Sequence, residues 1–123
     1  MTGRDRDQRP DQCVQLSVRM STSPRGTVLG IVGDVDLVTE ARFRAAFDQA
    51  LANEPDVLVA DLTGVTFLGS VGLRHLVTAD EAAGAGVLRV VPSPVARRAI
   101  EVSGLARVLA LRSTVDEAFH AGG

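Results

Sequence analysis

The chain has 123 residues, a formal net charge of −2 at pH 7, 46% hydrophobic residues and 23% charged residues. At roughly 100–200 residues per domain, this length allows one domain. The balance of apolar and charged residues is that of a globular protein, and it excludes wholesale disorder and a fibrous chain. No apolar run reaches the ~20 residues of a membrane-spanning helix. The near-neutral charge argues against direct binding of nucleic acid.

The N-terminal segment is polar and has no apolar core of the kind found in signal peptides, which predicts a cytoplasmic protein without a membrane association. Residues 1–12 carry alternating arginine and aspartate and are predicted to form a disordered tail, so residues 13–123 form the single domain. The one cysteine, Cys13, cannot make an internal disulfide or a cysteine-based zinc site. We expect it to act as a small apolar residue, with an intermolecular thiol role left open.

The first elements form a predicted hairpin. Apolar and polar residues alternate over residues 14–20, which indicates a half-buried strand. Residues 21–26 have the composition of a turn, and a second strand follows over residues 27–32. The short connection predicts that the two strands are antiparallel.

A helix is predicted over residues 39–53, with Thr39 as its N-cap and Pro55 beyond its end. One face of this helix carries apolar side chains at helical spacing, namely Phe43, Ala46, Phe47, Ala50 and Leu51. Residues 57–60 form a continuous apolar strand of the kind buried on both faces of a sheet. Residues 61–64 interrupt the apolar pattern before a short apolar run at 65–68.

The second half of the chain alternates helices and strands. The predicted helix at 71–83 turns Leu73, Leu76 and Val77 inward and ends at Gly84 and Gly86. A strand at 87–91, a helix from Ser93-Pro94 to residue 102 and a strand at 108–111 follow, and Ser113 or Thr114 caps a last helix. This order predicts an α/β fold in which helices pack on a mixed sheet.

Enzyme chemistry is hard to place in this sequence. His75 and His120 lie in different predicted helices, and neither has an evident nucleophile beside it. The segment Gly64–Gly69 lacks the Gly-Lys-Ser/Thr ending of a phosphate-binding loop, and metal-ligand spacings are absent. We therefore expect a protein that is not an enzyme and that holds no cofactor and no metal.

The most informative segment is Asp61–Leu73, in which a buried strand leads to a hydroxyl residue, Ser70, at the start of a helix. Gly69 and Gly72 leave that hydroxyl sterically open. Ser70 could simply cap the helix, a role worth about 1 kcal/mol. It could also be phosphorylated, because the positive end of a helix dipole favours a phosphate.

Three stretches in this order resemble the STAS domain, and specifically the bacterial anti-sigma factor antagonists. They are Gly33–Asp36 followed by Thr39, then Asp61–Leu73, then Ser93-Pro94 continuing through Arg97-Arg98 to Leu105. The resemblance covers about residues 14–120. It implies a STAS-type mixed sheet of four to five strands with about four helices packed on it.

The resemblance also implies a function. The family's phosphorylated serine corresponds to Ser70, and its acidic pair corresponds to Asp34 and Asp36. The unphosphorylated protein would bind an anti-sigma factor, usually a serine kinase of the GHKL type, and so release a sigma factor for transcription under stress. Phosphorylation would end the binding, and a PP2C-type phosphatase would restore it. The implied partner-binding residues are Asp34, Asp36, Gly69, Ser70, Val71, Gly72 and Arg74.

The sequence departs from the family in two places, because Gly69 stands where the family usually has aspartate and Val71 where it often has serine or threonine. The missing aspartate bears on recognition by the kinase. Asp34, Asp36 and Arg74 could equally be solvated side chains.

Simpler roles are expected for the other polar residues. We expect His75 to be a surface or semi-buried residue of its helix, Arg97-Arg98 to lie on a solvated helix face, and Asp61 to accept backbone N–H groups in a turn. The alternative functions are a STAS subunit of a lipid-transport complex, a ligand-sensing STAS module without a phosphoswitch, and an unrelated small α/β enzyme.

Overall fold

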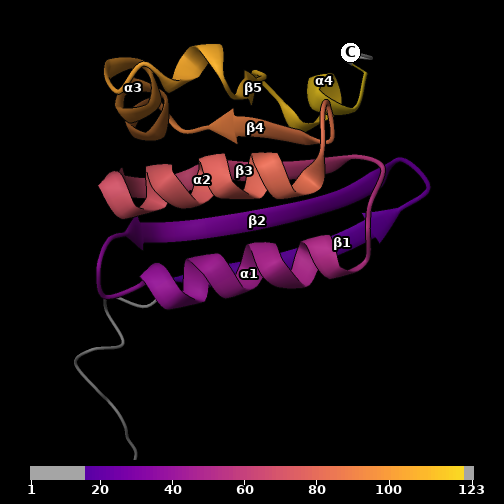
Figure 1. Ribbon diagram of the computed structural model, residues 1–123, viewed down its shortest axis with the longest axis horizontal. Coiled ribbons are helices and arrows are strands. Elements are labelled where there is room, and N and C mark those ends of the chain that lie inside the picture. The colour runs from indigo at the N-terminus through magenta and orange to yellow at the C-terminus, as the bar shows by residue number, and fades with distance from the viewer. Residues whose placement is uncertain (1–15, 121–123) are drawn as a thin grey trace, which may run out of the picture.

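A computed structural model describes residues 16–120 of the chain. Its elements, shown in Figure 1, are β1 (Ser17–Ser23), β2 (Gly26–Val35), α1 (Glu40–Ala52), β3 (Leu58–Leu68), α2 (Ser70–Ala83), β4 (Leu88–Pro92), α3 (Pro94–Val102), the 3-10 helix η3 (Leu105–Arg107), β5 (Ala110–Leu111) and α4 (Val115–His120). The predictions for the tail at 1–12 and for Cys13 lie outside the described residues.

The five strands form one mixed sheet in the order β1-β2-β3-β4-β5. The strands β1 and β2 pair antiparallel, from Ser17 opposite Val32 to Ser23 opposite Gly26, which confirms the predicted hairpin. The turn is confined to residues 24–25, shorter than the predicted 21–26, because the strands stay paired up to it. The pairs β2–β3, β3–β4 and β4–β5 are parallel. With the four α-helices of residues 16–120, this architecture confirms the predicted fold class.

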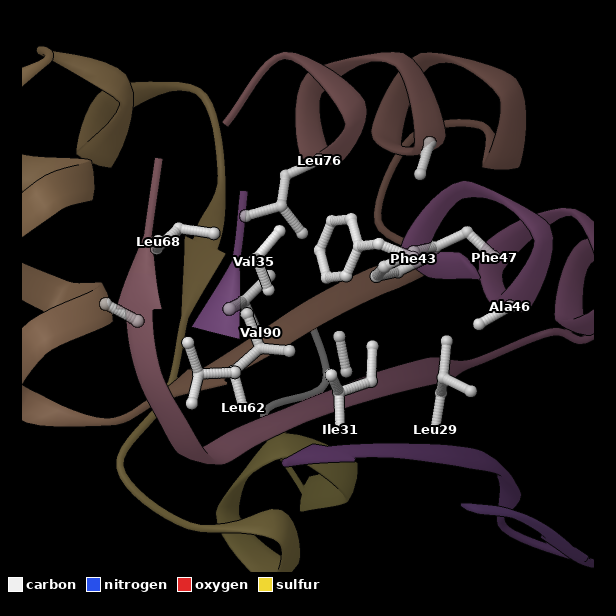
Figure 2. Packing of buried hydrophobic residues seen from close by; sticks show 14 of the residues in the cluster. Leu29, Ile31, Val35, Phe43, Ala46, Phe47, Leu62, Leu68, Leu76 and Val90 are labelled. Carbon is white, nitrogen blue, oxygen red and sulfur yellow. The ribbon is translucent and has the colours of Figure 1, made fainter. Parts of the chain in front are cut away.

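The main core lies between the sheet and helices α1, α2 and α3. Figure 2 shows side chains of α1 and α2, among them Phe43, Phe47 and Leu76, pointing toward those of β2, β3 and β4. The rings of Phe43 and Phe47 meet edge to face with centroids 5.1 Å apart. The inward face predicted for α1 is confirmed, since its buried residues are Phe43, Ala46, Phe47 and Ala50.

A second, smaller core forms where α4 packs on the sheet. Ala118 of α4 is buried together with Val59 of β3 and Val91 of β4. Because successive residues of a strand point to opposite faces, Val59 and its neighbour Leu58 of the main core face different sides of the sheet. The sheet is therefore covered on both faces near its β3–β4 centre.

The predicted break at residues 61–64 is wrong, since β3 is one continuous strand. Two register shifts against β2, between Gly30 and Val32 and between Gly33 and Asp34, let the polar stretch remain paired. Asp61 accepts the Thr63 N–H at 3.1 Å and the Thr63 hydroxyl at 2.7 Å, so it does accept a backbone N–H, but inside a strand rather than a turn.

The strand predicted at 108–111 is shorter than expected. It is reduced to Ala110–Leu111, because the chain before it forms η3, which Gly104 enters with a positive φ of 82°.

The helix ends follow their predicted signals, with one exception. The Ser93 side chain accepts the Ala96 N–H at 3.1 Å, and the Thr114 hydroxyl accepts the Glu117 N–H at 3.0 Å. Gly84 follows α2 with a φ of 97°, a conformation that favours glycine. Thr39 stands at the N-cap position of α1 but makes no side-chain cap hydrogen bond.

Candidate functional site

Ser70 is the first residue of α2, and its side chain is exposed. The N-cap residue of α2 is Gly69, so the interpretation of Ser70 as an N-cap is wrong. Within residues 16–120 the Ser70 hydroxyl has no hydrogen-bond partner. An exposed hydroxyl that holds no structural contact can be modified without breaking the fold.

Close packing against β2 fixes the start of α2. The Gly69 N–H donates to the Val35 carbonyl at 2.9 Å. A Cβ atom added at Gly72 would lie 2.6 Å from side-chain atoms of both Leu68 and Val35. Only a glycine at position 72 lets the first turn of α2 approach the ends of β2 and β3 this closely, and that approach sets the position of Ser70.

Val71 and Gly72 were predicted to contact a partner, but both are buried. They face the sheet because α2 packs its inner side there. The surface that α2 presents beside Ser70 instead includes Arg74, which is exposed and lies one helical turn further along.

The loop between β2 and α1 lies at the same end of the sheet as the start of α2 (Figure 1). Asp36 shapes this loop, since its carboxylate accepts the N–H groups of Val38 at 3.0 Å and Thr39 at 3.2 Å. The Thr39 hydroxyl is turned back into the loop, where it donates to the Asp34 carbonyl at 2.7 Å and accepts the Asp36 N–H at 3.0 Å. These bonds explain why Thr39 does not cap α1.

The Asp34 carboxylate accepts a hydrogen bond from the hydroxyl of Thr66 on the neighbouring strand β3. Asp34 and Asp36 are both half-buried. Both carboxylates therefore have internal partners and are not simply solvated. They help to hold the ends of β2 and β3 and the loop that follows β2.

Sequence reasoning missed two features of this end of the molecule. The first is a group of exposed apolar side chains, Leu37 and Val38 in the loop and Phe67 near the end of β3, which are 77%, 75% and 50% exposed. The Leu-Val pair within a loop was the available signal, because apolar residues in a loop have no helical or strand pattern that would bury them.

The second missed feature is a contact between the helices. The Nε2 atom of His75 on α2 lies 2.9 Å from the Glu40 carboxylate at the start of α1, and the two side chains are 12% and 32% exposed. This pair ties together the helix that carries Ser70 and the helix that follows the 36–39 loop. No local sequence pattern could show it, because the two residues are 35 positions apart.

Arg97 and Arg98 were expected to lie on a solvated helix face, and their surroundings agree with that. Arg98 is exposed, and Arg97 lies 3.9 Å from Glu101 on the same helix. Among residues 16–120, no cluster of His, Asp or Glu side chains has the arrangement of a metal site. None of the helices between these limits is both long and apolar enough to cross a bilayer.

The sequence profile described as the STAS domain matches residues 17–118. The chain belongs to the STAS domain family. Anti-sigma-F factor antagonist RsfB of Mycobacterium tuberculosis is 41% identical to this STAS protein over 93 residues, which are 74% of this chain and 76% of RsfB.

Solved structures agree with this assignment. The crystal structure of an anti-sigma factor antagonist from Mycobacterium paratuberculosis matches with a TM-score of 0.81 and 33% identity, over 87% of this chain and 93% of that one. The unphosphorylated form of SpoIIAA from Bacillus matches with a TM-score of 0.65 and 20% identity, over 85% of this chain and 95% of SpoIIAA. The second likeness supports the fold, and the first links the chain to antagonists of anti-sigma factors.

Proposed function

We propose that this STAS protein is an anti-sigma factor antagonist that binds an anti-sigma factor while Ser70 is unmodified and releases it when Ser70 is phosphorylated. The observation that carries this proposal is the position of Ser70, an exposed hydroxyl at the first residue of α2 that has no hydrogen-bond partner among the described residues. The names of RsfB and of the Mycobacterium paratuberculosis protein favour this function over a lipid-transport subunit or a ligand-sensing module.

The partner in this proposal is an anti-sigma factor of the GHKL serine kinase type, which would phosphorylate Ser70, and a PP2C-type phosphatase would remove the phosphate. ATP would belong to the kinase. The binding surface would consist of Ser70, Gly69 and Arg74 with the 34–38 loop. When this protein binds the anti-sigma factor, the sigma factor would be released and would then regulate transcription.

The switch works by charge at the contact itself. A phosphoserine adds about −1.5 to −2 charges. If one acidic group across the contact lies about 5 Å from the phosphate, each unit of phosphate charge weakens binding by about 3 kcal/mol at an effective dielectric constant of 20. Since every 1.4 kcal/mol is tenfold in affinity, the loss exceeds a hundredfold. No rearrangement of the fold is required, because Ser70 makes no internal bond within residues 16–120 that phosphorylation would break.

The test measures binding of the purified anti-sigma factors of the source organism to wild type, Ser70→Glu and Ser70→Gln by calorimetry. Gln and Glu have the same shape and differ in charge, so Gln is the matched control. We expect Ser70→Glu to weaken binding at least tenfold while Ser70→Gln stays within a few-fold of wild type. Thermal midpoints should be nearly unchanged in both variants. Equal binding by the two variants would remove the charge switch.

Phosphorylation is tested with the anti-sigma factor that binds. Incubation with ATP followed by intact-mass measurement should add one phosphate to wild type and none to Ser70→Ala, which should also bind constitutively. If wild type stays unmodified, as Ser70→Ala does, then the kinase does not recognise the Gly69-Ser70 sequence and the phosphoswitch is wrong.

A further inference from the structure

The four phenylalanines of this chain, its only aromatic residues, occupy very different environments. Phe43 and Phe47 are buried in the main core. Phe119 packs against the second core, with the Arg25 guanidinium 4.4 Å from its ring centre. Phe67 is 50% exposed, although β3 offers buried positions on either side of it at Val65 and Leu68. A half-exposed ring forgoes part of the free energy that its burial would contribute. One exposed apolar side chain is ordinary, but a group of them at one place indicates a contact surface.

Phe67 lies against the residue that precedes Ser70. A Cβ atom added at Gly69 would lie 3.2 Å from Cε2 and 3.7 Å from Cζ of the Phe67 ring. The ring edge therefore rests over the bare backbone of Gly69. The φ of Gly69 is −84°, which any residue adopts, so the backbone conformation does not require glycine at this position. The glycine leaves space for the ring.

Two more exposed apolar side chains belong to the same end of the sheet. Asp34 and Val35 of β2 pair with Phe67 and Leu68 of β3, and Leu37 and Val38 follow in the loop that leaves β2. Leu37 and Val38 are 77% and 75% exposed. The aromatic ring, this aliphatic pair and the Ser70 hydroxyl therefore leave from adjacent strand ends.

We propose that Phe67, which rests on Gly69, is the main apolar anchor of this surface and inserts into an apolar pocket of the anti-sigma factor, with Leu37 and Val38 at the border of that pocket. This inference rests on the proposed function and adds the chemistry of the partner. The pocket must be apolar and wide enough for a phenyl ring, and it must lie beside the position that receives the Ser70 hydroxyl.

Two physical arguments support an anchor at this position. Interface energy concentrates in a few side chains, often aromatic, that become fully desolvated at the centre of the contact. The ring already lies against the Gly69 backbone while its other side faces solvent, so an ordered ring of this kind loses less side-chain entropy on binding than a fully free one. The phosphate of Ser70 would then lie at the border of a desolvated contact, where charge is least tolerated.

The experiment measures the affinity of three variants for the anti-sigma factor that binds wild type in the test above. Phe67→Ser removes the ring, and Gly69→Ala places a Cβ atom where the ring rests. Val108→Ser is the matched control, since Val108 is 52% exposed but precedes β5, three strands away from β2 in the sheet. Thermal midpoints measured in parallel show whether each variant is folded.

We expect Phe67→Ser to raise Kd at least about 30-fold, which corresponds to about 2 kcal/mol. Gly69→Ala should raise Kd several-fold, because the displaced ring no longer matches the pocket, and Val108→Ser should bind as wild type does. Wild-type affinity in Phe67→Ser would overturn the proposal that Phe67 anchors the partner. Wild-type affinity in Gly69→Ala would overturn the proposal that Gly69 positions the Phe67 ring for binding. In both cases the proposed function would stand, whereas a wild-type protein that binds no anti-sigma factor would overturn the function together with this inference.

Discussion

At the scale of single residues, position 69 links the stability of a helix start to the proposed contact with the partner. An aspartate before the serine, as the family usually has, would accept the first N–H groups of α2. Gly69 makes no side-chain cap, and α2 has no acidic residue in its first turn. The start of this helix is therefore less stabilised than an N-terminus with an acidic cap, and it holds the Phe67 ring instead.

Gly69→Asp should stabilise the fold and weaken partner binding at the same time. A capping carboxylate contributes a few tenths of a kcal/mol over glycine, its charge adds about 0.3–1 kcal/mol at the helix N-terminus, and the loss of a glycine restricts the unfolded chain. The sum is about 1 kcal/mol, or roughly 3–5 °C in the thermal midpoint. Calorimetric unfolding checks the expected rise of the thermal midpoint, and the binding assay checks the expected loss of affinity. A lowered midpoint would show that the Phe67 ring cannot move aside.

Thr39 illustrates what local rules miss at this scale. Its type and position predict an N-cap, and it does stand immediately before α1. Its hydroxyl bonds to Asp34 and Asp36 instead, because the preceding loop folds back and offers a carbonyl and an N–H at closer reach. The cap rule predicts where the helix begins, and the loop decides what the side chain binds.

At the scale of elements, helix α2 carries Ser70 at its start and a partly buried carboxyl group near its end. Asp80 lies in the last part of α2, where burial first and the neighbouring Glu81 second raise the pKa of its carboxyl group. The C-terminal end of a helix also disfavours negative charge. Asp80 therefore destabilises the folded state whenever it is ionised.

Asp80→Asn should raise stability at pH 7 but not in acid. The pKa of Asp80 is higher in the folded state than in the unfolded chain, so ionised Asp80 lowers the free energy of unfolding. This loss of stability is fully present above the folded pKa. It disappears as the pH falls below the ordinary carboxyl pKa of about 3.9. Thermal midpoints of wild type and Asp80→Asn, measured from pH 7 down to pH 3, should converge as the pH falls. Glu81→Gln is the control, since the charge of Glu81 is the smaller cause of the raised Asp80 pKa. If the plots of thermal midpoint against pH for wild type and Asp80→Asn stay parallel, the expected pH dependence is wrong.

Strand β3 shows why a strand can be longer than the apolar runs in its sequence. The apolar runs on either side of residues 61–64 were predicted correctly, but the polar stretch between them reads as a break. In the fold, β2 lies alongside the whole stretch, and the two register shifts absorb the irregular positions. Pairing over a long strand satisfies backbone groups that a loop would leave to water.

At the scale of the whole molecule, two phenylalanines occupy opposite environments, one in the core and one on the surface. Phe43 is fully buried in the core that joins α1 to the sheet, whereas Phe67 lies on the surface beside Ser70. Phe43→Ala should cost about 3–5 kcal/mol, because it removes apolar contact and leaves a cavity. Urea unfolding should show this loss for Phe43→Ala and little change for Phe67→Ala. Similar losses in both would mean that Phe67 contributes to the core.

The sequence by itself determined the order of the elements, the hairpin, the inward face of α1 and the position of Ser70 at the start of a helix. These features depend on periodicity, turn residues and caps, which act over a few neighbouring positions. Tertiary structure alone decided that Val71 and Gly72 are buried, that His75 meets Glu40, and that Phe67 lies at the same end of the sheet as the Leu37-Val38 loop. These contacts join segments far apart in the chain, and the register of parallel strands that brings them together is set by packing of the whole core.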